Sequence, residues 1–172
     1  MHDRFAALAA ALAVALFATA APATAQDKST QQFLTKAIEG NLAEVQMGEL
    51  AQKNGQNADV KSFGQMLQQD HSSANQKAMD AAKKLGVNAP SAPNAKQKAD
   101  YDKMAKLQGP AFDKAFAQHM VMDHKKDIAE YKKASTKGDD AGQYAKDSLP
   151  VLEKHLQTAQ SLQKSAGKRS TR

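Results

Sequence analysis

The apolar residues of this chain recur every three or four positions in four long segments, a spacing typical of amphipathic helices. Asn54-Gly55, Gly86 and Gly138 separate these segments and mark helix ends. Sustained alternation of apolar and polar residues is absent and β-branched residues are sparse, so no strand is expected. Four helices of about 25 residues, each about 37 Å long, bury their apolar faces best against one another. The sequence therefore predicts an all-α four-helix bundle.

The connections between the predicted helices constrain the topology. Short turns near residues 55 and 138 make the first and second helices antiparallel, and likewise the third and fourth. Residues 86–109 are too many for a turn, and a short helix over residues 95–107 is expected there. That helix, at about 20 Å, plus about 36 Å of extended chain could cross the bundle. We expect a ferritin-like bundle with this extra helix in the crossover; an up-down-up-down arrangement is the alternative. Pro150 predicts a kink or break at Leu149.

Residues 1–25 have the features of a cleavable signal peptide. Arg4 supplies a positive charge, residues 5–18 are an uninterrupted apolar run, and Ala23-Thr24-Ala25 forms a small-residue cleavage site. The run is shorter than the about 20 residues that span a bilayer, and no later segment is apolar enough to do so. We therefore predict a periplasmic or secreted protein with a bundle domain over residues 26–165 and a disordered basic tail over residues 166–172.

Composition excludes several classes of function. The 172-residue chain has no Cys, which rules out disulfides, a lipidated cysteine anchor, thiol chemistry and thiolate metal sites. Its net charge is +6, but the Lys residues are mixed with Asp and Glu along the helices. With three Tyr and no Trp, this pattern does not indicate nucleic-acid binding. Peripheral contact with an anionic envelope surface is compatible with the charge, whereas an integral membrane segment is not expected.

Three histidines are expected to face the core of the bundle. Residues 63–71 and 116–124 share one pattern, in which a core Phe precedes a histidine by eight residues and an aspartate precedes it by one. This spacing places His71 and His124 on the buried stripes of their helices. His155 follows a core Leu by three residues and therefore also faces inward or nearly so.

These histidines and one carboxylate lie near the midpoints of four different helices, so they should meet at the waist of the bundle. Imidazoles and a carboxylate there would suit a mononuclear Zn, Fe, Mn or Cu ion. Carboxylates beside the histidines could accept the second hydrogen bond of an imidazole and fix its tautomer. The candidate ligands are Glu44, His71, His124 and His155, with Asp70 and Asp123 as the outer acceptors.

The same residues could instead form a structural polar layer, in which histidines and carboxylates bond one another and set the register of the helices. A di-iron bundle needs Glu-x-x-His on two helices, but Gln68, Val121 and Leu152 stand three residues before the histidines. A di-iron oxidase is therefore not expected. No Ser-His-Asp arrangement, phosphate-binding glycine loop or zinc-protease motif is present, so no enzyme is expected.

Several short elements of the sequence resemble a known bacterial family. They include Val60-Lys61-x-Phe63, Asp70-His71, His124 and Leu149-Pro150-x-Leu152-x-x-His155. Over about residues 29–163 the chain is similar to the family called domain of unknown function 4142, whose members are often labelled outer membrane or exported proteins. The resemblance implies a ferritin-like four-helix fold and no established activity. Glu44, His71, His124 and His155 match its recurrent polar positions.

Two functions are compatible with this pattern. The first is a structural, interaction or envelope-stress protein of the periplasm, in which the histidine, aspartate and glutamate residues are a layer that sets helix register. The alternative is a periplasmic, ferritin-like metal-binding protein with a mononuclear site.

Overall fold

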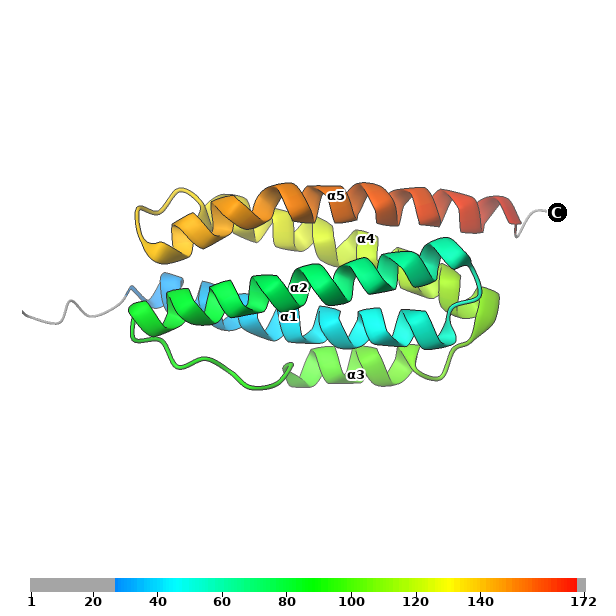
Figure 1. The fold of residues 1–172 in the computed structure, drawn as a ribbon, viewed down its shortest axis with the longest axis horizontal. Coiled ribbons are helices and arrows are strands. Elements are labelled where there is room, and N and C mark those ends of the chain that lie inside the picture. Colours follow the sequence, from blue (N-terminus) through cyan, green and yellow to red (C-terminus); the bar gives the residue numbers. More distant parts are fainter. Residues whose placement is uncertain (1–26, 170–172) are drawn as a thin grey trace, which may run out of the picture.

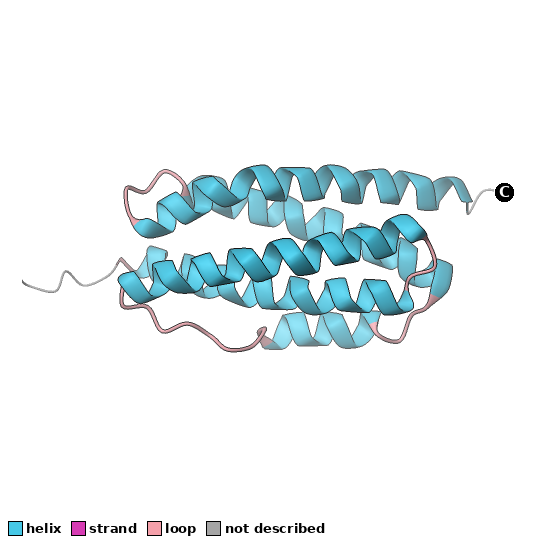
Figure 2. Cartoon of the chain, in the orientation of Figure 1, coloured by secondary structure: helices cyan, strands magenta, loops and turns pink. Residues whose placement is uncertain are grey.

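The computed structural model describes residues 27–169, with side chains up to Ala166, and these residues contain helices and no strands. The predicted signal peptide and residues 170–172 of the predicted tail lie outside the described residues. Helix α5 extends beyond residue 165, where the bundle domain was predicted to end. The helices are α1 (Lys28–Asn54), α2 (Ala58–Lys84), α3 (Ala95–Met104), α4 (Gly109–Ala134) and α5 (Asp140–Arg169) (Figures 1 and 2).

Short polar side chains begin the first three helices. Asp27 accepts a hydrogen bond from the backbone N–H of Ser29, and Asn57 accepts one from that of Asp59. Asn94 forms a reciprocal capping box with Gln97 at the start of α3. These caps satisfy backbone N–H groups that have no partner within the helix. Helix boundaries are therefore encoded locally.

The four long helices form a bundle whose second and third members run parallel. Helix α1 packs antiparallel to α2, and α4 packs antiparallel to α5. Residues 85–108 return the chain along the length of the bundle, and α3 within this segment contacts α1 and α4 (Figure 1). The crossover is thus the arrangement observed, and the up-down-up-down alternative is not.

Two glycines bring α1 and α2 close together near the waist. A Cβ atom at Gly48 would lie 2.5 Å from the carbonyl oxygen of Gly64, and one at Gly64 would lie 2.6 Å from that of Gly48. Only glycine fits at both positions without separation of the helices. This contact lies one turn after Glu44 and two turns before His71, so it fixes the helix spacing beside the candidate site.

Of the kink or break predicted at Leu149, the break is wrong, because α5 continues through Pro150. Pro150 cannot donate a backbone hydrogen bond to the carbonyl of Lys146. Both residues are exposed, so water can solvate that carbonyl. The helix therefore continues, and Leu152 and His155 keep their places on its buried face.

Two apolar cores lie on either side of the waist. One is rich in large side chains, including Phe63, Phe112 and Phe116. The other contains many alanines together with Tyr131 and Tyr144. Between them, α1 carries polar side chains in buried positions: Asn41 and Glu44 are buried, whereas Leu42 and Val45 are only half-buried. The waist of the bundle is therefore polar.

Candidate metal centre

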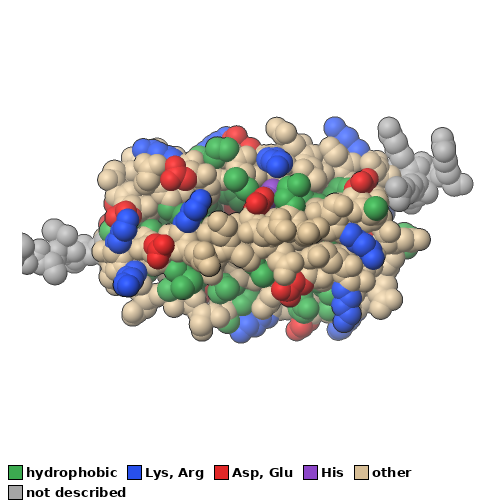
Figure 3. Space-filling model, in the orientation of Figure 1, with side chains coloured by type: hydrophobic (Ala, Val, Ile, Leu, Met, Phe, Trp, Pro, Cys, Tyr) green, Lys and Arg blue, Asp and Glu red, His purple; other side chains and the backbone are tan. Residues whose placement is uncertain are grey.

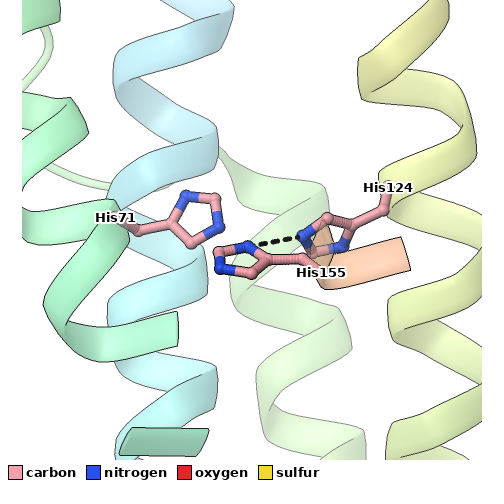
Figure 4. Close-up of side chains that lie close together, drawn as sticks. All are labelled: His71, His124 and His155. Atoms are coloured by element: carbon pink, nitrogen blue, oxygen red, sulfur yellow. Dashed lines mark hydrogen bonds between the residues drawn. The ribbon is translucent and has the colours of Figure 1, made fainter. Parts of the chain in front are cut away.

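The imidazoles of His71 on α2, His124 on α4 and His155 on α5 meet at the waist (Figure 4). All three side chains are buried. One ligand nitrogen from each ring lies within 4.8 Å of one from each of the others. The ring centres of His71 and His124 are each 5.3 Å from that of His155. The sequence predicted that each histidine faces the core from its own helix and that the three meet at the waist. Their positions in the bundle agree with this expectation.

Each histidine uses one ring nitrogen for a contact that points away from the cluster. His71 Nδ1 lies 2.9 Å from the side-chain oxygen of Asn41, and His124 Nδ1 lies 3.1 Å from the backbone carbonyl oxygen of Met120. His155 Nε2 lies 2.8 Å from a carboxylate oxygen of Asp70. Because all three partners are acceptors, each of these ring nitrogens must carry the proton.

Burial keeps the three rings neutral. It lowers the pKa of His71 well below its usual value, with the neighbouring imidazoles acting in the same direction. Burial lowers the pKa of His124 to about 4. The pKa of His155 is also lowered by burial, although its hydrogen bond to Asp70 acts the other way. At neutral pH each ring therefore has one N–H and one nitrogen lone pair.

The proton positions leave the inward nitrogens as lone pairs. His124 Nε2 and His155 Nδ1 face each other at 3.3 Å, the contact that is dashed in Figure 4. His71 Nε2 makes no hydrogen bond to any described residue. With neutral rings and outward N–H groups, no proton is left to lie between these nitrogens. Three lone pairs converge, and a cation bound among them would satisfy all three.

The nitrogen positions fit a first-row transition metal. Zn–N bonds of about 2.0–2.1 Å at a tetrahedral angle place two nitrogens about 3.3 Å apart, which is the separation found between His124 and His155. His71 would move toward this pair to complete the set. Imidazole suits Zn, Cu and Fe, whereas Mn prefers oxygen ligands. Hydrogen bonds from the outer nitrogens to carboxylate or carbonyl oxygens are the usual support of metal-binding histidines.

Glu44, the carboxylate predicted as a fourth ligand, does not lie with the three nitrogens. Its Oε1 atom is 3.9 Å from His124 Nδ1, the nitrogen that already donates to Met120. Glu44 is 2% exposed, and its carboxyl group lies against the Asp123 side chain with no N–H donor from a described residue. Burial raises the pKa of Glu44 well above its usual value, and the charges of Asp123 and Asp127 add to this.

The two predicted outer aspartates have different surroundings. Asp70 accepts the hydrogen bond of His155, as an outer acceptor should. Asp123 is half-buried and lies on the same side of the waist as Glu44. Both residues line one cavity there. No hydrogen bond joins Asp123 to any of the three described imidazoles. The acceptors of His71 and His124 are instead Asn41 and the backbone of Met120.

A hydrogen-bonded chain behind His71 was missed from the sequence. Asn41 donates from its amide to the hydroxyl of Tyr144, which lies 3.1 Å from the hydroxyl of Tyr131. This orients the amide oxygen of Asn41 toward His71. Tyr131 follows His124 by seven residues and Tyr144 precedes His155 by eleven, spacings that return to the same helix face. The signal was therefore present in the helical periodicity.

The cluster lies beside a cavity of about 200 Å³ between α2 and α5. Figure 3 shows a histidine side chain at the base of a hollow on this face, beside an acidic and a basic side chain. A bound ion would thus have a route to solvent at a position that the three imidazoles leave open. The lining includes Asp70, His71, Lys77, Asp147, Val151 and His155.

The fold and this cluster define an all-α bundle with a buried three-histidine waist. The chain belongs to the family described as domain of unknown function 4142 (DUF4142), whose sequence model matches residues 15–162. No curated protein and no solved structure matches the chain. Within residues 27–169, none of the helices combines the length and hydropathy needed to cross a membrane.

Proposed function

We propose that this protein is an exported metal-binding protein, located in the periplasm or secreted, that holds one transition-metal ion at the waist of its bundle. His71 Nε2, His124 Nε2 and His155 Nδ1 are the ligands, and water or a small solute fills the remaining position. Zn, Cu and Fe suit the imidazole donors. The protein binds the ion and performs no catalysis of its own. Residues 1–25, with their charge, apolar run and small-residue site, support export.

One observation carries this proposal: all three outer ring nitrogens face acceptors, so all three inner nitrogens are lone pairs that converge. In a polar layer that served only packing, the contact between His124 and His155 should carry a proton. Here a proton at that contact would have to come from a second protonation of a buried ring. Burial opposes this, because it lowers the pKa of both histidines.

The test compares the metal content of wild type and two variants, each purified from the periplasm without an affinity tag or chelator. His124→Ala removes a ligand, whereas His119→Ala removes a half-buried histidine five residues earlier on the same helix. We expect about one metal ion per chain in wild type and His119→Ala. His124→Ala should lower the affinity at least 100-fold while retaining the helical circular dichroism, since two imidazoles hold such an ion poorly.

Wild type that contains no metal, and gains no thermal stability when Zn, Cu or Fe is added, would contradict the proposal. An equal loss of metal in the two variants would place the ion elsewhere.

The second candidate function is the structural or interaction protein with a polar layer at its waist. The hydrogen-bonded chain from His71 through Asn41 to Tyr144 and Tyr131 favours it, because this chain links all four long helices. In that case wild type binds no metal, and replacing His124 lowers stability only. Envelope association of such a protein would be peripheral.

A further inference from the structure

Tyr144 on α5 is a buried tyrosine whose hydroxyl lies behind the histidine cluster. This hydroxyl is 3.0 Å from the amide nitrogen of Asn41 and 3.1 Å from the hydroxyl of Tyr131. Asn41 in turn places its amide oxygen 2.9 Å from Nδ1 of His71. One amide side chain therefore separates Tyr144 from the imidazole whose other nitrogen faces the waist.

The two tyrosine hydroxyls have one proton more than their mutual contact uses. Burial raises the pKa of Tyr131 well above its usual value and also raises that of Tyr144, so both keep their protons. The oxygen of Tyr144 accepts the amide proton of Asn41, and one phenolic proton lies between the two hydroxyls. Both tyrosines line the cavity between α2 and α5, where the hydroxyl of Ser148 and water can accept the other proton.

The opposite orientation of the Asn41 amide would place the additional proton at the waist. The amide nitrogen would then donate to Nδ1 of His71, and the amide oxygen would accept the proton of Tyr144. Because a neutral imidazole has a single N–H, Nε2 of His71 would carry it. This nitrogen has no hydrogen-bond partner among the described residues, and burying an N–H without an acceptor is unfavourable. The observed orientation leaves Nε2 as a lone pair and the additional proton at the cavity.

We propose that Tyr144 is a positioning residue for the metal ion: by accepting the amide proton of Asn41, its hydroxyl holds His71 in the tautomer that binds metal. This inference rests on the metal site proposed above. Second partners of metal-binding histidines fix the tautomer and the ring orientation, and here Tyr144 fixes the orientation of that partner. Packing alone does not require the hydroxyl, because the ring of Tyr144 already packs with those of Phe33 and Tyr131.

The experiment compares wild type, Tyr144→Phe and Tyr101→Phe. Tyr144→Phe removes one hydroxyl and keeps the ring. Tyr101→Phe makes the same chemical change on α3, outside this hydrogen-bonded chain, and serves as the matched control. Nitrogen-15 NMR of the metal-free proteins reports which ring nitrogen of His71 carries the proton. Competition with a chromophoric chelator gives the affinity for Zn²⁺, and circular dichroism confirms that each protein is folded.

We expect His71 to be protonated at Nδ1 in wild type and Tyr101→Phe, and to be a mixture of both tautomers in Tyr144→Phe. Tyr144→Phe should bind Zn²⁺ about 10-fold more weakly, the lower end of the effect of removing an outer partner of a metal-binding histidine. A purely structural hydroxyl would change stability and leave the tautomer as in wild type. That result, or an unchanged Zn²⁺ affinity, would overturn this inference and leave the metal site standing. A wild type that binds no Zn²⁺ would overturn both proposals.

Discussion

The buried polar groups on the two sides of the bundle waist differ in whether they have hydrogen-bond partners. On the histidine side, every outward ring nitrogen has an acceptor, supplied by Asn41, Met120 or Asp70. On the carboxylate side, Glu44 has no donor and faces two aspartates. One side therefore has unused lone pairs, and the other has a buried carboxyl group whose pKa is raised well above its usual value. A cation held by the three imidazoles would satisfy the lone pairs, whereas the ring of His124 separates Glu44 from that position.

A second buried carboxylate shows that the bundle can satisfy such a group when the site is purely structural. Asp113, at the start of α4, accepts hydrogen bonds from the backbone N–H groups of Gln56 at 3.0 Å and Asn57 at 2.9 Å. It thereby ties α4 to the turn between α1 and α2. Glu44 has a similar degree of burial and no donor. The difference indicates that burial of Glu44 lowers the stability of the fold, whereas burial of Asp113 does not.

The largest effect on stability is expected at Asp113. Asp113→Ala removes two hydrogen bonds to a charged acceptor and leaves the N–H groups of Gln56 and Asn57 without their partner. We expect the free energy of unfolding to fall by about 3–5 kcal/mol, measured by urea denaturation. Metal affinity, measured where the variant is still folded, should not change. A loss below about 1 kcal/mol would show that the hydrogen bonds of Asp113 do not stabilise the fold, and would remove the contrast with Glu44.

A smaller effect on the free energy of unfolding is expected when the pH is lowered. The folded state holds the pKa of His124 at about 4, against the usual histidine value of 6.5. Between these values the unfolded chain binds more protons, so metal-free protein should lose stability as the pH falls, by about 2 kcal/mol from pH 7.5 to 5 for this residue. Glu44 and Asp127 act in the opposite direction, because their pKa values are raised, that of Asp127 to about 7.

Comparison with His124→Asn isolates the histidine contribution to this pH dependence. The difference in unfolding free energy between pH 7.5 and pH 5 should shift by about 2 kcal/mol in the variant, toward greater relative stability in acid. If urea denaturation gives the same pH dependence for wild type and variant, the burial of a neutral His124 is contradicted.

The smallest expected effect is an increase in the stability of the metal-free protein. Glu44→Met replaces the unpartnered carboxylate by an apolar side chain of similar size, so metal-free protein should become more stable by about 1 kcal/mol. Chemical denaturation in the presence of a chelator measures this. A loss of stability in metal-free Glu44→Met would indicate that Glu44 has a structural partner and would remove the contrast with Asp113.

The helical periodicity predicted the helices and the position of the three histidines, because both depend on local spacing. It did not identify the role of Glu44. Position on a helix gives the face and the level of a side chain. Asn41, Glu44 and Val45 lie around one edge of the buried face of α1, and packing against the other helices decides which of them is buried. Spacing also does not specify which ring nitrogen points outward. That depends on partners such as Asn41, Met120 and Asp70, which come from three helices.

The most direct test is a crystal structure of the zinc-loaded protein, with anomalous diffraction recorded on both sides of the zinc absorption edge. We predict one anomalous peak per chain, about 2.0–2.1 Å from His71 Nε2, His124 Nε2 and His155 Nδ1. The outer nitrogens should keep their contacts with Asn41, Met120 and Asp70. An anomalous peak elsewhere, or three imidazoles with no peak between them at saturating zinc, would contradict the account.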